Sequence, residues 1–367
     1  MQRVSNFGSL LQSYSLKKII EGLGAEVHFI DIERNESDDR AAQKSRITYD
    51  NEAEAHGGLL SKFKKLDRYA LNRLRIKLRS RKQEKLFEAF RKDILRIAPE
   101  DNQKKYDLCV IGSDEVFNCT APSPWGFTSQ LFGNVRQADE VITYAASCGA
   151  TSPDRLMPQM LTIIENAFQR VQGFSARDEN TEAFMKAMTD EKVFRHSDPV
   201  LIGDFSDEIE KTEIRKKLPQ KFCIIYSYYN RIHDPAEIRA IQSFCRKQNL
   251  KPIAIGAPQM WLKSYLPTTP FEMMKIFQMA DFIITDTFHG TLFSAKLNGH
   301  FAVMCRESNR NKLSDLVKTL HVQNHVVGRF EELDRVYKEF SNKEDFKEFY
   351  NNSREQSMNY LKDFLKN

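Results

Sequence analysis

Short apolar runs alternate with longer segments of helical periodicity along most of the chain. The apolar runs predict strands at residues 26–31, 107–111, 141–146, 171–175, 222–226, 252–255, 282–284 and 301–304. The segments between them predict helices at residues 8–22, from 178, at 235–248, 269–280 and 290–297, and from 342 onward. Short apolar strands that alternate with helices are typical of a parallel sheet covered by helices on both faces.

The length of 367 residues fits two domains of ordinary size better than one compact core. We therefore expect an α/β fold of two Rossmann-like, doubly wound domains that face a cleft. The predicted boundaries place the N-terminal domain at 1–200 and the C-terminal domain at 201–330, with a final helix at 342–367 that packs back on the body.

Positive charge is concentrated between residues 61 and 105, where 16 Lys or Arg stand against 6 Asp or Glu, although the whole chain has a net charge of only +5. Apolar residues recur there at helical spacing and predict two amphipathic helices with basic outer faces: Phe63, Leu66, Leu71 and Leu74, then Phe87, Phe90 and Ile94. The segment is either a solvated helical excursion of the N-terminal domain or a surface that approaches acidic lipid head groups or a lipid-linked acceptor. No aromatic-interleaved basic motif accompanies the charge, which argues against nucleic acid as a partner.

The remaining composition argues against several classes of protein. No run approaches the ~18 apolar residues that span a bilayer, and the N-terminus has no hydrophobic signal segment. The six cysteines lie far apart without a CxxC pair, which argues against a zinc site and a disulfide-rich secreted scaffold. We expect a cytoplasmic protein, free or at the inner face of the membrane, that uses no metal and no cofactor.

Three predicted strands end in polar groups, at the sheet edge where α/β folds bind ligands. After the strand at 282–284 come Asp286, Thr287, His289, Gly290 and Thr291. Gly290 permits a close approach of the backbone. A lone histidine is more often structural, but His289 at the mouth of a strand-to-helix loop is a candidate acid or base.

The other two strand ends carry acids and a cation. Asp114 and Glu115 follow the strand at 107–111 and suit hydroxyl recognition or general-base work, although Asp114 can also cap a following helix. Arg177 follows the strand at 171–175 and suits a carboxylate or phosphate, although it can also pair with Asp178 or a surface acid. The sequence contains no P-loop, HExxH or GxSxG motif and no GxGxxG after a strand.

Six segments resemble the motifs of the polysaccharide pyruvyltransferase family, in the order of that family. They are residues 6–16 (NFGSLLQSYSL), 111–118 (IGSDEVFN), 144–149 (YAASCG), 174–178 (FSARD), 198–201 (DPVL) and 288–291 (FHGT). The sequence departs from the family at Thr287, where many members carry arginine. Each match alone is weak, whereas six in order are a strong signal.

The resemblance implies a fold like that of the two-domain GT-B glycosyltransferases. It also implies transfer of pyruvyl from phosphoenolpyruvate to a sugar of a cell-surface polysaccharide or its lipid-linked precursor, with formation of a cyclic ketal and release of phosphate. This chemistry needs a proton for the enol carbon, cations for the donor and a base for a hydroxyl. A GT-B-like glycosyltransferase that uses a nucleotide-sugar is the competing enzyme hypothesis, and a glycan- or lipid-binding module is the non-enzymatic one.

The resemblance also implies roles for individual residues. His289 matches the catalytic histidine, and Asp114 is the second candidate catalytic residue. The predicted donor-binding residues are Arg177, Arg306, Lys312, Gly290 and Thr291. The predicted acceptor-binding residues are Asn6, Gln12, Ser113 and Glu115.

Overall fold

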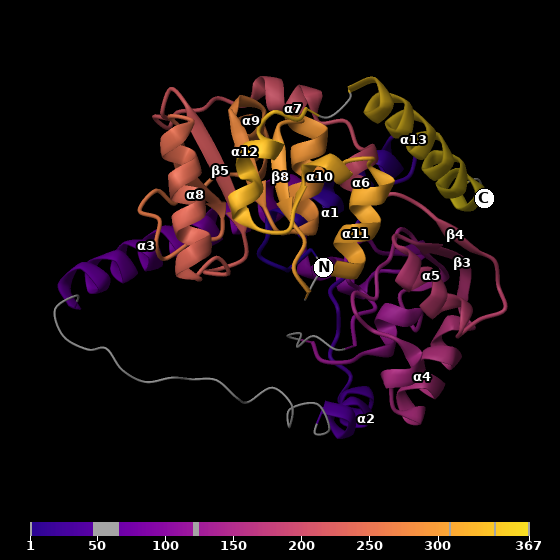
Figure 1. The fold of residues 1–367 in the computed structure, drawn as a ribbon. Coiled ribbons are helices and arrows are strands. Elements are labelled where there is room, and N and C mark those ends of the chain that lie inside the picture. The colour runs from indigo at the N-terminus through magenta and orange to yellow at the C-terminus, as the bar shows by residue number, and fades with distance from the viewer. Residues whose placement is uncertain (1, 47–65, 120–124, 308–309, 341–342, 366–367) are drawn as a thin grey trace.

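The computed structural model describes residues 2–46, 66–119, 125–307, 310–340 and 343–365, and its strands form two parallel sheets (Figure 1). The first sheet has the order β1 (Tyr106–Ile111), β2 (Ala138–Thr143), β3 (Val171–Ala176), β4 (Val193–Arg195). The second has the order β6 (Lys251–Gly256), β5 (Phe222–Ser227), β7 (Phe282–Thr285), β8 (Phe301–Met304), β9 (Val326–Val327). Every pair of neighbouring strands is parallel, as the sequence pattern predicts.

Helices separate the strands and cover the sheets. They are α1 (Phe7–Glu21), α2 (Glu36–Arg46), α3 (Leu66–Phe90), α4 (Pro158–Phe168), α5 (Glu179–Lys186), α6 (Pro199–Ile202), α7 (Ser206–Lys211), α8 (Pro235–Lys247), α9 (Pro270–Met279), α10 (Phe288–Leu297), α11 (Arg310–Thr319), α12 (Leu333–Val336) and α13 (Lys343–Leu365). The sequence of strand β5 is apolar because both faces of the strand are buried. Ile224 and Tyr226 lie in the core on one face of the sheet, and Cys223 and Ile225 lie in the core on the other face.

Helix α1 lies between the two sheets and contributes to the core of each. Near its N-terminus, Phe7 and Leu10 are buried in the same core as Ile224 of the second sheet. Near its C-terminus, Ile19 is buried in a core with Ile142 of the first sheet. The carboxyl ends of strands from both sheets consequently lie near the N-terminus of α1.

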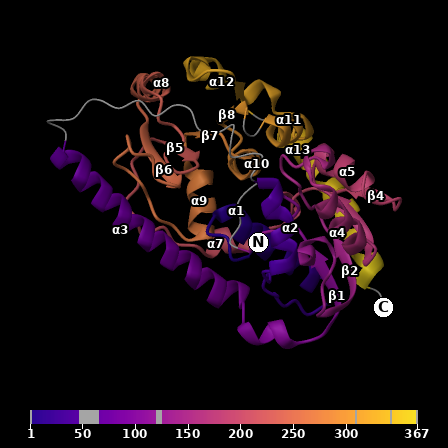
Figure 2. The same ribbon diagram turned by 90° about the horizontal axis from the view of Figure 1, so that it is seen from below.

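Two further helices pack far from their neighbours in sequence (Figures 1 and 2). Helix α3 precedes the first sheet but runs along the second, where the Gln83 amide donates to the Thr268 carbonyl at 2.8 Å and accepts from its N–H at 3.0 Å. Helix α13 follows the second sheet but packs on the first, where the Tyr360 hydroxyl donates to the Thr143 carbonyl at 2.9 Å. These crossings tie the first and last parts of the chain to both sheets.

Two predictions about elements are wrong. Residues 26–31 form no strand, because their backbone groups form hydrogen bonds with side chains rather than with a neighbouring strand. The Gln2 side-chain amide donates to the Ile30 carbonyl at 2.7 Å, and the Asn102 side chain accepts from Asp31 N–H at 2.6 Å. The described part of the basic segment, from residue 66 onward, forms one long helix, α3, that continues into a π-helical turn at Arg91–Leu95, rather than two helices.

The predicted apolar stripe of the basic segment is divided in the structure. Phe87 and Phe90 are buried as expected. Leu74 and Ile94, however, are 55% and 37% exposed, so they lie off the buried face. Phe63 lies outside the described residues.

Candidate functional site

A cavity of about 180 Å³ lies where strand ends of both sheets meet the N-terminus of α1. Its lining comes from the loops after β1, β3, β5, β6 and β7, from residues 5–7 and from α11. This volume is below the roughly 300–1,000 Å³ typical of sites for drug-sized ligands. The cavity therefore suits a small molecule or one end of a larger one.

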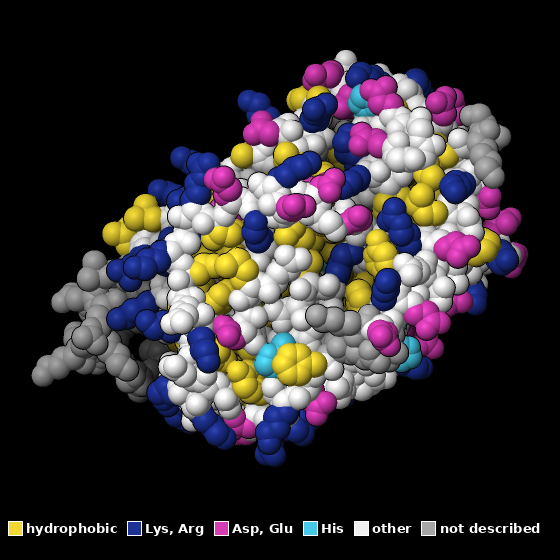
Figure 3. Space-filling view, turned by 90° about the horizontal axis from the view of Figure 1, so that it is seen from above, with side chains coloured by type: hydrophobic (Ala, Val, Ile, Leu, Met, Phe, Trp, Pro, Cys, Tyr) yellow, Lys and Arg dark blue, Asp and Glu magenta, His cyan; other side chains and the backbone are white. Residues whose placement is uncertain are grey.

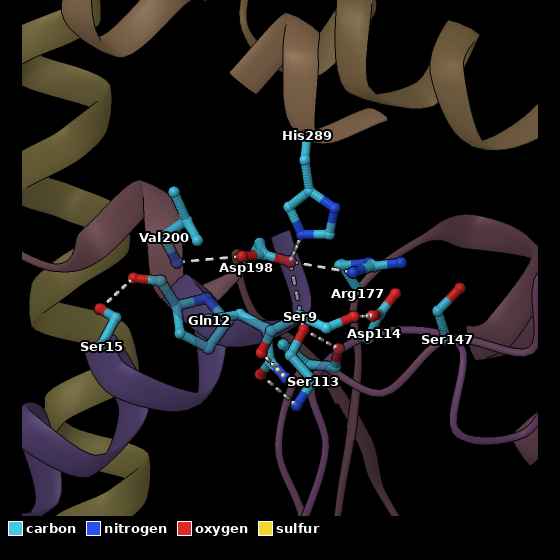
Figure 4. A network of polar contacts seen from close by, with 12 residues as sticks. Ser9, Gln12, Ser15, Ser113, Asp114, Ser147, Arg177, Asp198, Val200 and His289 are labelled. Carbon is cyan, nitrogen blue, oxygen red and sulfur yellow. Dashed lines mark hydrogen bonds and ion pairs between the residues drawn. The ribbon is translucent and has the colours of Figure 1, made fainter. Parts of the chain in front are cut away.

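His289 enters this cavity from the first turn of α10 (Figure 4). The turn is fixed by Thr287, whose hydroxyl caps the helix by accepting from Gly290 N–H at 2.9 Å. The imidazole lies directly against Gly8 of α1, because a Cβ built on Gly8 would be 2.2 Å from His289 Nδ1. A glycine at position 8 is thus what leaves room for the ring.

Asp198 lies on the other side of the imidazole, with Oδ2 at 3.5 Å from His289 Nε2. The same Oδ2 accepts from Arg177 at 2.9 Å and from the Ser113 hydroxyl at 3.3 Å, while Oδ1 accepts from Val200 N–H at 2.9 Å. Burial opposes ionisation of this carboxyl, but its contacts with His289 and Arg177 outweigh burial and lower its pKa. Asp198 is therefore a fixed negative charge that orients two neighbours.

Arg177 follows β3 and is almost fully buried, with its guanidinium 4.3 Å from the centre of the Phe288 ring. Burial disfavours its charge, yet Asp198 and Asp114 raise its pKa above the ordinary value. The predicted alternative of an ion pair with Asp178 is wrong, because the Asp178 carboxylate accepts from Ser147 and from the first turn of α5. Arg177 Nε is buried without a hydrogen-bond partner in the described structure.

Asp114 caps no helix, because the residues after it form a tight turn. Its backbone has a φ of 74°, in the left-handed region that glycine favours. Its Oδ2 accepts from the Ser9 hydroxyl at 2.6 Å, and its Oδ1 accepts from Glu115 N–H at 3.0 Å. Burial opposes its ionisation, but the charges of His289 and Arg177 outweigh burial and lower the pKa of Asp114, so this carboxyl is held in its ionised form.

Glu115 and Lys312 join the two sides of the cavity. Lys312, from α11, forms a short ion pair with Glu115, which follows β1. The other oxygen of Glu115 accepts from the Asn118 amide at 2.6 Å. Burial lowers the proton affinity of Lys312, but the charge of Glu115 outweighs it and raises its pKa. Lys312 therefore remains a cation at the cavity wall.

The sequence model of the family described as polysaccharide pyruvyl transferase matches residues 6–304. The chain belongs to the polysaccharide pyruvyl transferase family. It is accordingly an enzyme of the transferase class, and its family indicates pyruvyl transfer in polysaccharide synthesis. A search of curated proteins finds no match to this chain.

Most of the site residues that the sequence predicts for this pyruvyl transferase lie together. The cavity is lined by six of them: Asn6, Asp114, Glu115, Arg177, His289 and Lys312. Asn6 also caps α1, with its side chain accepting from Ser9 N–H at 2.7 Å. Residues spread over three hundred positions of sequence thus share one small cavity, because strand ends of two sheets converge on α1.

Five predicted residues do not line the cavity. Gln12 and Ser113 are buried beneath it, where the side-chain Oε1 of Gln12 accepts from Ser113 N–H at 3.1 Å. The Thr291 hydroxyl donates to the Thr287 carbonyl of its own helix at 2.9 Å. Direct contact of these residues with a substrate remains a prediction, and their present bonds favour support of the cavity wall.

The remaining two residues, Gly290 and Arg306, hold neighbouring elements together in this structure. A Cβ on Gly290 would be 2.1 Å from the Thr285 hydroxyl, so the glycine allows α10 to approach β7. Arg306 donates to both oxygens of Glu237 at 3.0 Å and to Asp286 at 2.7 Å. Arg306 thereby joins β8, β7 and α8 away from the cavity lining.

Sequence reasoning missed Asp198, Ser9 and the end of β5. Asp198 is the first residue of the DPVL segment, which matches a family motif, but that segment was interpreted as a linker and not as part of the site. At the end of β5, Ser227 and Tyr228 line the cavity, and the Ser227 hydroxyl is buried without a partner in the described structure. The apolar run at 222–226 that precedes these two residues contains no motif that would predict a site.

The described residues contain no group of three or more His, Cys, Asp or Glu side chains arranged to hold a metal ion. Within the same residues, no helix has both the length and the apolar surface needed to cross a membrane.

Proposed function

We propose that this pyruvyl transferase takes its pyruvyl group from phosphoenolpyruvate and joins it, as a cyclic ketal, to a sugar of a cell-surface polysaccharide or its lipid-linked precursor. The observation that carries the proposal is the placement of His289 between Gly8 and Asp198, in a cavity that Arg177 and Lys312 also line. A proton donor and two cations around about 180 Å³ suit a small donor that bears a carboxylate and a phosphate.

In the proposed reaction, His289 gives its proton to the methylene carbon of phosphoenolpyruvate, which becomes a methyl group. Asp114 accepts the proton of the first sugar hydroxyl as its oxygen bonds to the neighbouring carbon. The second hydroxyl then forms the other carbon–oxygen bond as phosphate leaves and takes up the second proton. One donor and two hydroxyls thus give one ketal and one phosphate.

The contacts of Asp198 support the role of His289 as the acid. A carboxylate beside one imidazole nitrogen fixes the orientation of the ring. The N-terminus of α10, where His289 lies, adds backbone N–H groups that favour an anion. Arg177 keeps one unpartnered N–H, at Nε, that can donate to the carboxylate or phosphate of the donor.

We also propose the architecture that this chemistry uses. The two sheets would belong to GT-B-like domains at 1–200 and 201–330, with the cavity in the cleft between them and the helix at 342–367 bound to the body. The first sheet would carry the acceptor beside Asp114 and Glu115, and α10 and α11 would carry the donor. Lipid-linked acceptors would place the enzyme in the cytoplasm at the inner face of the membrane.

A thermal-shift comparison tests the choice of donor, because a ligand that binds only the folded state raises the melting temperature. We expect phosphoenolpyruvate to stabilise the protein and UDP-glucose to leave it unchanged. Inorganic phosphate and pyruvate serve as controls for the two anionic halves of the donor. Stabilisation by the nucleotide-sugar without any by phosphoenolpyruvate would favour the glycosyltransferase alternative.

A further inference from the structure

Helix α3 exposes two leucines on the side that faces away from the protein. Leu74 and Leu78 are 55% and 56% exposed and stand four residues apart, so they are neighbours on one face. The opposite face is buried through Ile76, Phe87 and Phe90. These leucines therefore contribute nothing to the core that the rest of the helix helps to form.

Cations flank the two leucines on the solvent side. We define the α3 outer face as Leu74, Arg75, Lys77, Leu78, Arg81, Lys82 and Lys85, all of them exposed. Two acids of the same stretch, Glu84 and Glu88, are 50% and 62% exposed and both pair with the buried Arg91, so the five cations of the α3 outer face remain in excess over the acids beside them. By contrast, acidic and basic side chains are interspersed over the face seen from above in Figure 3.

We propose that the α3 outer face binds the surface of a bilayer that contains anionic lipids. A helix that presents apolar side chains between rows of Lys and Arg lies in the plane of a membrane interface, with its leucines in the acyl boundary and its cations at the head groups. Long cationic side chains extend toward the phosphates while their stems cover apolar surface. The exposed leucines favour this occupant over nucleic acid, which would need the charge alone.

The position of α3 gives membrane binding a consequence for the cavity. Farther along the helix, Glu84 accepts from the Ser5 hydroxyl at 2.6 Å, and Phe87 packs edge-on against Phe7 with ring centres 4.9 Å apart. Ser5 and Phe7 line the cavity. At about 1.5 Å per residue, Leu78 and Phe87 are only roughly 14 Å apart along the axis. A bound α3 would hold the cavity near the bilayer, where the lipid-linked acceptor of the proposed function would lie.

Vesicle sedimentation of the full chain tests membrane binding without any pyruvyl transfer, so its outcome is separate from that of the proposed function. The probes are vesicles of phosphatidylcholine alone and of phosphatidylcholine mixed with phosphatidylglycerol. We expect binding to the anionic vesicles at low salt, weaker binding as salt rises, and little binding to the neutral ones. Equal binding to both kinds of vesicle, or none to either, would overturn the proposal.

Two double variants test the two parts of the surface. Leu74→Ser with Leu78→Ser, and Arg81→Glu with Lys85→Glu, should each weaken binding to anionic vesicles by about tenfold or more. The matched control, Arg155→Glu with Arg170→Glu, makes the same change in net charge at exposed positions beside α4 and should bind like the wild type. Unfolding curves that match the wild type establish that the variants are folded.

Retention of vesicle binding by the folded leucine variant would show that charge alone suffices, and would overturn insertion at the interface. Equal losses in the α3 charge variant and the α4 control would show that net charge, rather than α3, governs binding. That outcome would overturn the assignment of the surface.

Discussion

Gly8 and His289 are 281 positions apart in the sequence (289 − 8), yet a side chain on Gly8 would overlap the imidazole ring of His289. This contact explains why the NFG segment at the start of the chain and the FHGT segment near its end belong to one site. The sequence predicted both segments as parts of the site, but it gave no means of pairing them. The pairing depends on where α1 lies, which is a property of packing.

Gly8→Ala tests this contact directly. In most helices this change stabilises by roughly 0.5–1 kcal/mol, but here the added methyl must displace the imidazole. We expect phosphate release from phosphoenolpyruvate to fall by about tenfold or more, because catalytic groups tolerate little displacement. Gly22→Ala at the other end of α1, where the nearest atoms would be 3.3 Å away, is the matched control and should remain active.

Arg177→Lys tests whether the donor needs a guanidinium. Lysine keeps the charge but loses the planar fork and the Nε donor, so we expect it to weaken binding of phosphoenolpyruvate almost as much as Arg177→Ala does. Loss of one charge-assisted contact corresponds to about 2 kcal/mol, or about 30-fold in the dissociation constant measured by calorimetry. Unchanged donor affinity in both variants would make Arg177 solely the partner of Asp198.

At the scale of elements, the buried strands and their intervening helices were predictable because each is a short apolar run beside a helical repeat. The helix predicted at 269–280 is present as α9 and begins with a capping box formed by Thr269 and Glu272. The extended segment at 26–31 was not distinguishable from a strand, because its side chains alternate as a strand would but its backbone bonds go to distant side chains. Long-range contacts of that kind leave no local signal.

The two hydrogen bonds between the Gln83 side chain of α3 and the Thr268 backbone can be tested by mutation. Gln83→Ala removes both partners of the buried Thr268 backbone groups, and each unsatisfied group costs about 1–3 kcal/mol. We expect the free energy of unfolding in urea to fall by about 2–6 kcal/mol. Lys82→Ala, one residue away and exposed, should change it little; an equal loss would mean that α3 contributes only through its helical propensity.

At the scale of the whole molecule, the sheets could be predicted but the crossings of α3 and α13 could not. Each of these helices has an apolar stripe. Such a stripe indicates that the helix packs against the protein, but it does not indicate which other element the helix packs against. The sequence placed the basic segment in the N-terminal domain and gave no sign that α3 also bonds, through Arg79 and Gln83, to the segment between β6 and α9. Asp198 escaped prediction for a similar reason, since its partners come from separate elements.

A buried histidine between the first sheet and α13 links stability to pH. His196 lies 2.8 Å from the Ser175 hydroxyl and stacks on Tyr144, and burial lowers its pKa from 6.5 to about 4. The unfolded chain therefore binds a proton that the folded chain does not between these values, and stability is lost as the pH falls through this range.

Between pH 6.5 and 5 this loss amounts to about 2 kcal/mol. The measurement is urea unfolding of the wild type and of His196→Gln at both pH values. The variant should show a correspondingly smaller loss, because its side chain does not titrate. Equal losses in the two proteins would mean that His196 is protonated in the folded state.

The measurement that tests the central claim most directly compares His289→Asn with the wild type. Asparagine keeps hydrogen bonding near Asp198 but has no acidic proton, so the proposed mechanism predicts that phosphate release from phosphoenolpyruvate, measured with an acceptor-containing polysaccharide precursor fraction, falls by about 100-fold or more. Calorimetry should show nearly unchanged affinity for phosphoenolpyruvate, because Arg177 and Lys312 still hold the donor. Pyruvyl transfer by His289→Asn at close to the wild-type rate would contradict the account, since the enol carbon would then take its proton from another group.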